Sequence, residues 1–535
     1  MRRFLAFLLV MSVVAALAAG CGGQTQSPPP EEDEETAEEP AGGPKAGGTV
    51  VWAHGHDAAY IDPGYAYTGE DIDPTMLVFE TLLNYEFSPD GGVTYSSNLA
   101  TEWSHSDDGL EWTFNLRDGV KFHDGTDFNA DAVVFSFKRL YDETHPYFIE
   151  GRWSYFDDLL GDVLEDVIAE DENTVKIVLK RPFAPLLTYL GYYSESIVSP
   201  AAVEKYGEDF FKNPVGTGPF KLEEWRKDDR IVLVPFEGYW GDKPYLERVI
   251  LRVVPEVSTR LAEMETGGVH IFQSPPSEQI PRIKANPQLE VGSFPAAQLA
   301  YVAINNDTVT DVRLRQAIAH AVDWDKIVEV IWGELGYRAS SILPGGVLGS
   351  HSDLKPYEFD QEKAKDLLAQ AGIPQGYQLT MIAPNAPRWS HPDPITGLEM
   401  VQNDLKAVGI DVVAKPLEMG AWSAATTAGE YDLAWAGWMD VPDPNNFLHT
   451  LLVVYGGTRW RYQNEEVTDL AIKGASTYDN SERAGYYEQL QEIVYSEVPA
   501  IPVAYGNAVY AYVANLKGFN VGADGILRLH RAYLE

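Results

Sequence analysis

The chain has 535 residues, of which 45% are hydrophobic and 12% aromatic. A chain of this length is too long for one hydrophobic core, so it predicts more than one folded unit. Its 80 acidic and 40 basic residues give a formal charge of -40, which repels phosphate backbones and argues against nucleic acid as a partner.

Residues 1–20 have the three parts of an export signal. Two arginines precede an apolar run from Phe4 to Leu17, which is short for a membrane span. Small residues then lead into Cys21, the only cysteine of the chain, and this stretch resembles a bacterial lipobox, Leu17-Ala18-Ala19-Gly20-Cys21. The resemblance implies that the Cys21 thiol carries a diacylglyceryl group and becomes the mature N-terminus. The alternative is an ordinary secretory signal cut near Ala19, with Cys21 incidental.

Residues 21–47 contain three consecutive prolines, an acidic run from Glu31 to Glu35 and a glycine-rich end. Such a segment cannot bury apolar surface and is predicted to be disordered. It indicates a tether that holds a globular body away from a membrane. Two acyl chains on Cys21 would anchor that tether stably, where a single chain would be marginal.

From Thr49 onward, strand-like and helix-like patterns alternate, which predicts α/β sheets. Trp112, Phe114 and Leu116 fall on one face of a predicted strand, and Asn129 can cap the helix that follows. The remaining predicted elements are a hairpin of 221–225 and 231–234, strands at 251–254, 378–382 and 410–414, and helices at 259–265, 312–322, 325–334, 361–371 and 396–408.

The stretch from Trp112 to Gly125, which reads WTFNLRDGVKFHDG, and the segment Phe128 to Val133 form the most specific motif of the chain. They resemble the family 5 extracellular solute-binding proteins, the periplasmic dipeptide-, oligopeptide- and nickel-binding proteins of ABC importers. Further matches follow in the order of the family: Pro214 to Phe220, Tyr239-Trp240, Val312-Arg313, Gln316-Ala317, Ala371-Gly372, Val408 to Ile410, Gly437-Trp438 and Asp443-Pro444.

The resemblance implies a periplasmic-binding-protein-like α/β fold, in which two α/β lobes joined by a hinge close on a solute, with an extra subdomain in lobe I. The implied limits are about 48–295 for lobe I, with the subdomain at about 71–215, about 296–505 for lobe II, and 506–535 for a return to lobe I. Hinges are expected near Ala297 to Ala300 and near Tyr505.

The same resemblance implies a function without catalysis. The protein is expected to capture a small solute, in the first place a peptide, and to deliver it to the permease subunits of an ABC transporter. It is expected outside the cytoplasm as a lipid-anchored monomer, attached to the membrane through Cys21 and without a cofactor. An oligosaccharide or a nickel complex in place of the peptide remains open.

The competing hypothesis is an extracytoplasmic hydrolase, which needs a nucleophile or a metal site. The sequence has no Gly-x-Ser-x-Gly elbow and no Gly-x-x-x-x-Gly-Lys-Ser/Thr phosphate loop, and its one thiol lies in the lipobox. His54 and His56 alternate on a predicted strand and could hold a metal together with Asp57. The favoured alternative is two polar positions at a strand end beside Gly55, so no metal is expected.

Binding residues are predicted between Tyr431 and Phe447, in the segment YDLAWAGWMDVPDPNNF. Its first residues alternate as a strand would, and the chain leaves the sheet at Gly437, at the kind of strand end where open α/β folds bind ligands. In the peptide-binding members of the family, an aspartate shortly after the Gly-Trp pair meets the α-ammonium of the ligand. The matching residue here is Asp440, with one residue fewer between it and Trp438 than in that pattern.

Two tryptophans precede this aspartate. Trp438 is expected to form a pocket wall, with an apolar face for a peptide or a stacking face for a sugar. Core packing is the alternative for Trp435 and Trp438, and it is favoured for Trp435. Asp443-Pro444 is interpreted as a turn or a helix start. The predicted ligand-binding set is therefore Asp440, Trp438, Gly437 and Trp435.

Overall fold

The computed structural model describes residues 44–87, 93–149, 156–386, 388, 390–439, 441–454 and 456–535. The predicted export signal, Cys21 and most of the tether lie outside these residues, as does Asp440. Residues Pro44–Glu535 form one unit by their internal contacts. Within the described ranges, no helix is long and apolar enough to span a membrane.

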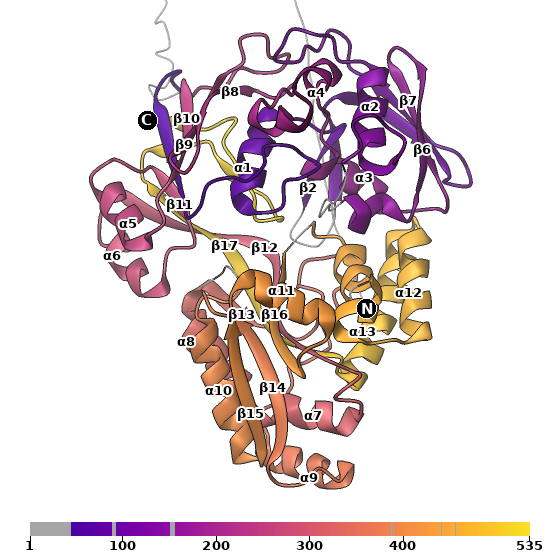
Figure 1. Ribbon diagram of the computed structural model, residues 1–535, viewed down its shortest axis with the longest axis vertical. Helices are drawn as coiled ribbons and strands as arrows, with labels where there is room; N and C mark the ends of the chain where they lie inside the picture. The colour runs from indigo at the N-terminus through magenta and orange to yellow at the C-terminus, as the bar shows by residue number, and fades with distance from the viewer. Residues whose placement is uncertain are drawn as a thin grey trace, which may run out of the picture. The chain divides into compact units, whose positions relative to one another are not determined.

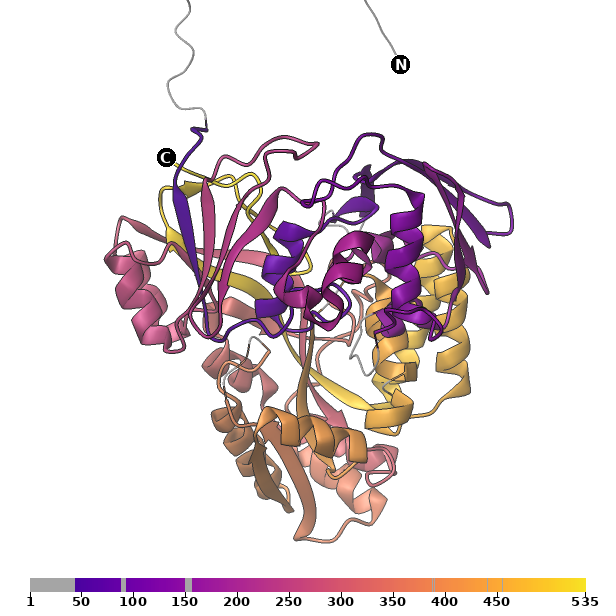
Figure 2. The same cartoon turned by 45° about the horizontal axis from the view of Figure 1, so that its top comes forward.

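One 11-stranded mixed sheet runs through this unit and joins its two lobes (Figure 1). Its strand order is β15-β14-β16-β12-β17-β11-β1-β10-β9-β8, and β13 pairs with β17 outside this path. The two longest strands, β12 (Leu289–Ile304) and β17 (Ala500–Val513), are antiparallel neighbours and pass from one lobe into the other (Figure 2). Their register shifts between Pro295 and Gln298, so the pairing is irregular at the place where a hinge is predicted.

Lobe I contains the sheet from β11 to β8, and its core also includes residues between Ala508 and Ala532 of the C-terminal segment. Its strands are β1 (Thr49–His54), β8 (Phe220–Arg226), β9 (Arg230–Pro235), β10 (Arg248–Val253), β11 (Ile271–Gln273), β18 (Leu516–Lys517), β19 (Asn520–Val521), β20 (Leu527–Arg528) and β21 (Tyr533–Leu534). Its helices are α1 (Gly69–Val78), α4 (Pro200–Tyr206), η3 (Gly207–Lys212), α5 (Val257–Glu265), η4 (Ser277–Gln279) and α6 (Ile280–Lys284).

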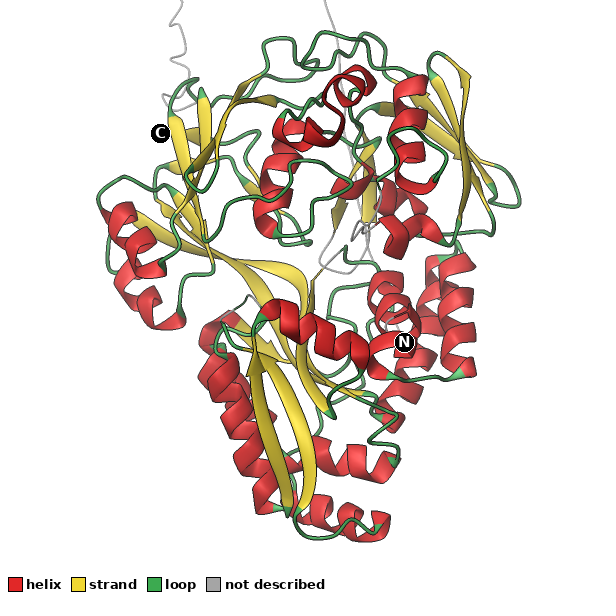
Figure 3. Ribbon diagram, in the orientation of Figure 1, coloured by secondary structure: helices red, strands yellow, loops and turns green. Residues whose placement is uncertain are grey.

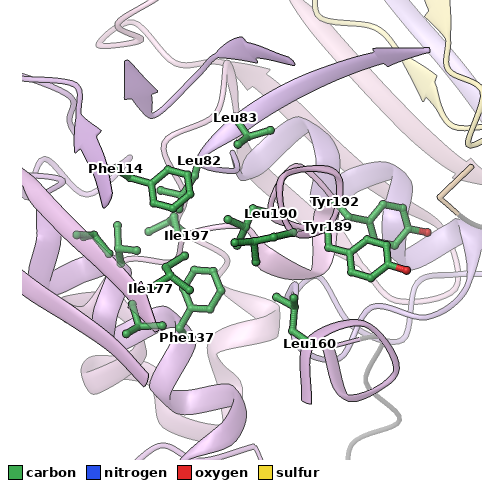
Figure 4. Packing of buried hydrophobic residues seen from close by; sticks show 14 of the residues in the cluster. Leu82, Leu83, Phe114, Phe137, Leu160, Ile177, Tyr189, Leu190, Tyr192 and Ile197 are labelled. Atoms are coloured by element: carbon green, nitrogen blue, oxygen red, sulfur yellow. The ribbon is translucent and has the colours of Figure 1, made fainter. Parts of the chain in front are cut away.

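A further hydrophobic core is built mostly from residues between β2 and η2, with Val441 and Ala475 of lobe II packed into it. We call the part from β2 to η2 the inserted subdomain. It has a four-stranded sheet in the order β4-β5-β7-β6, covered by α2 (Figure 3). Val133 and Phe137 of α2 belong to its core, and Figure 4 shows Phe137 beside Ile177 of β7. Its elements are β2 (Leu83–Phe87), β3 (Val93–Ser97), β4 (Ala100–His105), β5 (Glu111–Leu116), α2 (Ala130–Tyr141), η1 (Asp157–Gly161), β6 (Leu164–Asp171), β7 (Thr174–Leu179), α3 (Leu186–Leu190) and η2 (Tyr193–Glu195).

Lobe II has a hydrophobic core on each face of its sheet. Side chains alternate between the two faces along β12, so Val302 belongs to one core and Leu299 to the other. Helices α7 to α10 cover one face, and α11 to α13 with η6 cover the other. Its elements are α7 (Val312–Ala321), α8 (Trp324–Ile331), η5 (Gly333–Leu335), β13 (Gly336–Arg338), α9 (Gln361–Ala371), β14 (Tyr377–Pro384), α10 (Pro394–Ala407), β15 (Ile410–Leu417), α11 (Met419–Ala428), β16 (Leu433–Met439), η6 (Asn445–Val454), η7 (Gly456–Trp460), α12 (Glu465–Ser476) and α13 (Asn480–Glu497).

The structure confirms the predicted α/β fold class. The exact domain limits stay a prediction. Trp112, Phe114 and Leu116 are buried on one face of β5, and the Asn129 side chain accepts a hydrogen bond from the Ala132 amide at the start of α2.

The most specific sequence motif joins the inserted subdomain to lobe I. The His123 amide donates to the Gly216 carbonyl at 2.9 Å, and its Nε2 lies 2.9 Å from the Gly218 carbonyl oxygen. Beside them, the buried Glu80 carboxylate accepts hydrogen bonds from the side chains of Thr217, Tyr239 and Trp240 at 2.8 to 2.9 Å. Burial raises the pKa of Glu80 to about 7, although these donors act in the opposite direction. These family motifs are therefore structural and hold the subdomain on lobe I.

Candidate functional site

The carboxyl ends of two neighbouring strands in lobe II form the edge where the binding residues are predicted. Strands β14 and β16 are parallel, with Met381 paired to Leu433, so the loops that follow them leave the sheet on the same side. The loop after β14 also contacts β16 directly. A Cβ built on Gly437 would lie 2.2 Å from the Ser390 Cβ, so only glycine fits at this position of β16.

Trp435 lies in the core and does not line this edge. Its side chain is fully buried in the α7 to α10 core of lobe II. The His391 ring stands edge-on to it, with centroids 5.4 Å apart, and Ser390 Oγ lies 2.8 Å from His391 Nδ1. Burial holds the pKa of His391 well below its usual range, so this imidazole is neutral. Core packing, the favoured alternative for Trp435, is what the structure has.

Trp438 is half-buried at the end of β16 and faces η6. Its indole Nε1 donates to Asn446 Oδ1 at 2.7 Å. The neighbouring Asn445 Nδ2 donates to the Tyr189 hydroxyl of the inserted subdomain at 3.0 Å, so this helix reaches across the boundary between the lobes. Asn445 Oδ1, Asn446 Nδ2 and Thr450 Oγ1 are buried without a hydrogen-bond partner among the described residues. Unsatisfied buried polar atoms of this kind can be paired by an ordered water or a bound solute.

The turn between β16 and η6 is held by a buried ion pair. Asp443 accepts two hydrogen bonds from Arg483 Nη2 of α13, at 2.7 and 2.9 Å, and the two side chains are 3% and 7% exposed. Asp443 Oδ1 also accepts the Asn445 amide at 2.8 Å, directly before η6, which confirms the interpretation of Asp443-Pro444 as a helix start. Arg483 Nε donates to the Gly474 carbonyl at 3.1 Å, so the same side chain ties α12 to this turn.

The last described residue of β16, Met439, lies beside the irregular part of β12. Its sulfur accepts a hydrogen bond from Gln298 Nε2 at 2.9 Å, and it approaches Gly525 of the C-terminal segment. Next to Gly525, the buried Asp524 pairs with Arg528 at 2.6 Å. Burial opposes ionisation of Asp524, but the guanidinium outweighs it and lowers the pKa of Asp524. The end of β16 therefore lies where lobe II meets the returning C-terminal segment.

One cation lies on the loop after β14. Arg388 has an exposed side chain, and its amide and carbonyl pair with those of His391 at 2.9 and 3.0 Å. Two backbone hydrogen bonds therefore hold Arg388 next to His391, whose ring packs against Trp435 of β16. The edge thus offers a positive side chain, the Trp438 ring and buried amides of η6.

The histidines considered for a metal do not form such a site. Strand β1 ends at His54, so His56 lies beyond the strand and the two do not alternate along it. His54 Nε2 instead lies 2.9 Å from the Asp73 carboxylate of α1. Burial raises the pKa of Asp73 to about 6 against the opposing effect of His54. Among the residues that the structure describes, no group of three or more His, Cys, Asp or Glu side chains could hold a metal ion.

Two α/β lobes joined by continuous strands, with a partly polar edge at their boundary, define the class of two-lobed binding proteins. More specifically, the chain belongs to the bacterial extracellular solute-binding proteins, family 5, whose profile matches residues 94–458. It is a solute-binding protein of the extracytoplasmic space and not an enzyme.

The dipeptide-binding protein of Escherichia coli is 32% identical over 501 residues, which cover 89% of this chain and 93% of that protein. The heme-binding protein A of Haemophilus influenzae is also 32% identical, over 485 residues and 87% of each chain. Among solved structures, the periplasmic binding protein DppA of Helicobacter pylori in complex with the peptide STSA superposes with a TM-score of 0.82 at 31% identity, covering 92% of this chain and 99% of that one.

The residues that position this edge carry little signal in the sequence. Ser390 and His391 come together with β16 only through the parallel pairing of β14, and Arg483 meets Asp443 across 40 positions of sequence. A charged side chain on the buried face of α13 was the signal available for Arg483.

Proposed function

We propose that the chain is the lipid-anchored peptide-binding protein of an ABC importer, which captures a peptide between its lobes and delivers it to the permease. The observation that carries the proposal is the edge formed by β14 and β16 at the lobe boundary, with Asp440 directly after the last described residue of β16. The names of several relatives of similar identity, which include a dipeptide-binding protein at 32% and a di/tripeptide-binding protein at 31%, support a peptide as the solute.

A free peptide carries one charge of each sign, and the proposed site pairs each of them with one residue. Asp440 would pair with the α-ammonium group, and the exposed Arg388 provides a cation for the α-carboxylate on the neighbouring loop. Trp438 would supply an apolar wall between them. The anchor at Cys21 would keep the protein near the permease, and it lies outside the described residues.

A cycle of two changes tests the pairing of Asp440 with the ammonium group. Asp440→Asn keeps the shape of the side chain and removes its charge, and N-acetylation of the peptide removes the ammonium charge. Truncating one side of a buried charge pair costs roughly 2 to 5 kcal/mol, so each change alone should weaken binding at least about tenfold. The second change should then have little further effect.

Arg388→Gln with C-terminal amidation of the same peptide provides the matching cycle at the other end. The two cycles should be independent, so that Asp440→Asn leaves the effect of amidation unchanged. Additive effects of Asp440→Asn and N-acetylation would refute the ammonium pairing. Tight binding of heme or a neutral oligosaccharide, with no peptide bound, would replace the peptide by that solute and leave the solute-binding assignment intact.

A further inference from the structure

A tyrosine of lobe II docks on the inserted subdomain, outside the β14 and β16 edge. Tyr478 lies between α12 and α13, and its ring stacks on His105 of β4 with centroids 5.3 Å apart and 11° between the planes. Its hydroxyl donates to the Gly109 carbonyl at 3.2 Å and accepts the Phe183 amide at 3.3 Å. We call these contacts the Tyr478 clasp.

The clasp is fitted closely on both sides. A Cβ built on Gly109 would lie 2.6 Å from the Tyr478 hydroxyl, so the turn between β4 and β5 has no room for a side chain at this position. Next to it, the Ala184 amide donates to the Ala475 carbonyl at the end of α12, at 2.7 Å. The loop that presents Tyr478 is itself fixed, because Asp479 caps α13 by accepting the Glu482 amide at 2.9 Å.

The inserted subdomain is joined to lobe I by a buried ion pair and by hydrogen bonds of its most specific motif, while Val441 and Ala475 of lobe II also pack into its core. Arg139 of α2 makes a bidentate, buried ion pair with Asp62, at 3.0 and 2.8 Å. The hydrogen bonds of His123 to Gly216 and Gly218 add to this junction. Both Arg139 and Asp62 are buried, so separating them would leave two desolvated charges, whereas the Tyr478 clasp consists of a few hydrogen bonds and ring contacts at a partly exposed position. The subdomain therefore moves with lobe I, and separation of the lobes breaks the clasp.

We infer that Tyr478 is a positioning residue for solute binding, which favours the closed form through contacts between the lobes and touches no solute. This inference rests on the proposed capture of a solute between the lobes. The apparent dissociation constant of a solute equals the intrinsic one divided by the fraction of binding-competent protein. A contact present only in the closed form raises that fraction, and so strengthens the binding of every solute by the same factor.

The first test needs no solute and uses the full chain. In Tyr478→Ala, the amides of Phe183 and Ala184 should exchange with solvent about tenfold faster, and X-ray scattering should give a larger radius of gyration than for the wild type. Tyr478→Phe keeps the stacking on His105 and loses both hydroxyl hydrogen bonds, so it should lie between the two. The control is Tyr60→Ala, since Tyr60 and Tyr478 are both 39% exposed and Tyr60 stacks on Tyr65 within lobe I.

A second pair of variants approaches the clasp from the other lobe. Gly109→Ala and Gly119→Ala both place alanine at a positive φ, +68° and +74°, in turns of the inserted subdomain, so both carry the same local strain. Gly119 has open space around its Cβ position, so only Gly109→Ala collides with Tyr478. Gly109→Ala should reproduce the exchange and scattering of Tyr478→Ala, and Gly119→Ala should resemble the wild type.

The second readout is affinity. Tyr478→Ala should raise the dissociation constants of all bound peptides by one common factor, about three- to tenfold, while Asp440→Asn should affect only ligands with a free ammonium group. Unchanged scattering and unchanged affinities in Tyr478→Ala would overturn the inference, and so would fast exchange at Ala184 in the wild type. A protein that binds no peptide but still expands in Tyr478→Ala would refute the proposed solute and leave the clasp standing.

Discussion

The buried pair of Asp443 and Arg483 should be one of the most sensitive points of lobe II. Asp443→Ala removes both carboxylate hydrogen bonds of the buried Arg483 guanidinium, at 2.7 and 2.9 Å, while the bond from Nε to the Gly474 carbonyl and the contact with the Tyr487 ring remain. Removing one partner of a buried pair costs about 3 to 5 kcal/mol, because the other charge stays desolvated. The Asn445 amide loses its acceptor at the same time, which adds to the loss.

The magnitude can be measured by urea unfolding, followed by the fluorescence of the tryptophans. The control is Asp209→Ala, which removes an exposed pair with Lys212 whose side chains are 64% and 57% exposed, and should change the free energy of unfolding by less than about 1 kcal/mol. The double variant Asp443→Ala with Arg483→Met removes both charges and should recover most of the loss. A loss below about 1 kcal/mol for Asp443→Ala, or a double variant as unstable as the single one, would refute the reasoning.

Three further predictions concern pH, packing and the anchor. Burial raises the pKa of Glu80 from 4.5 to about 7, so between these pH values the folded state keeps a proton that the unfolded state has lost. The free energy of unfolding should therefore fall by roughly 3 kcal/mol as the pH rises from 4.5 to 7. Glu80→Gln should make the urea midpoint depend less on pH over this range. Gly437→Ala places a Cβ 2.2 Å from the Ser390 Cβ and should lower the free energy of unfolding by about 1 to 3 kcal/mol, and adding Ser390→Gly should restore most of it. The control is Gly485→Ala, which has open space on α13 and should raise the free energy of unfolding slightly. Equal effects of the two glycine changes would contradict this packing. Cys21→Ser should release the protein from the membrane fraction on detergent partitioning, and finding unmodified Cys21 in a freely secreted wild type would remove the lipoprotein proposal.

The sequence was sufficient to predict the elements whose signal is local. The alternation of apolar and polar residues around Trp112 and Phe114 predicted β5, and Asn129 predicted the start of α2. The two lobes have no local signal in the sequence and were predicted from the resemblance to a family. The alternation assumed for His54 and His56 failed because Gly55 follows the last residue of β1 and the chain leaves the sheet there.

The contacts that organise the site are not local and could not be predicted. Tyr478 meets Gly109 across 369 positions of sequence, and Asn445 meets Tyr189 across 256, so only the assembled fold brings them together. Trp435 and Trp438 illustrate the same limit, because they lie on opposite sides of one strand. Their different environments depend on His391 and Asn446, which come from other elements.

Calorimetric titration of the protein with free di- and tripeptides tests the central claim most directly. At least one peptide should bind with one-to-one stoichiometry, and Asp440→Asn should weaken the binding of that peptide by at least about tenfold without lowering the thermal stability of the solute-free protein. If no peptide binds to the wild type, or if Asp440→Asn binds the same peptide with unchanged affinity, capture of a peptide ammonium group at the edge of β14 and β16 is contradicted.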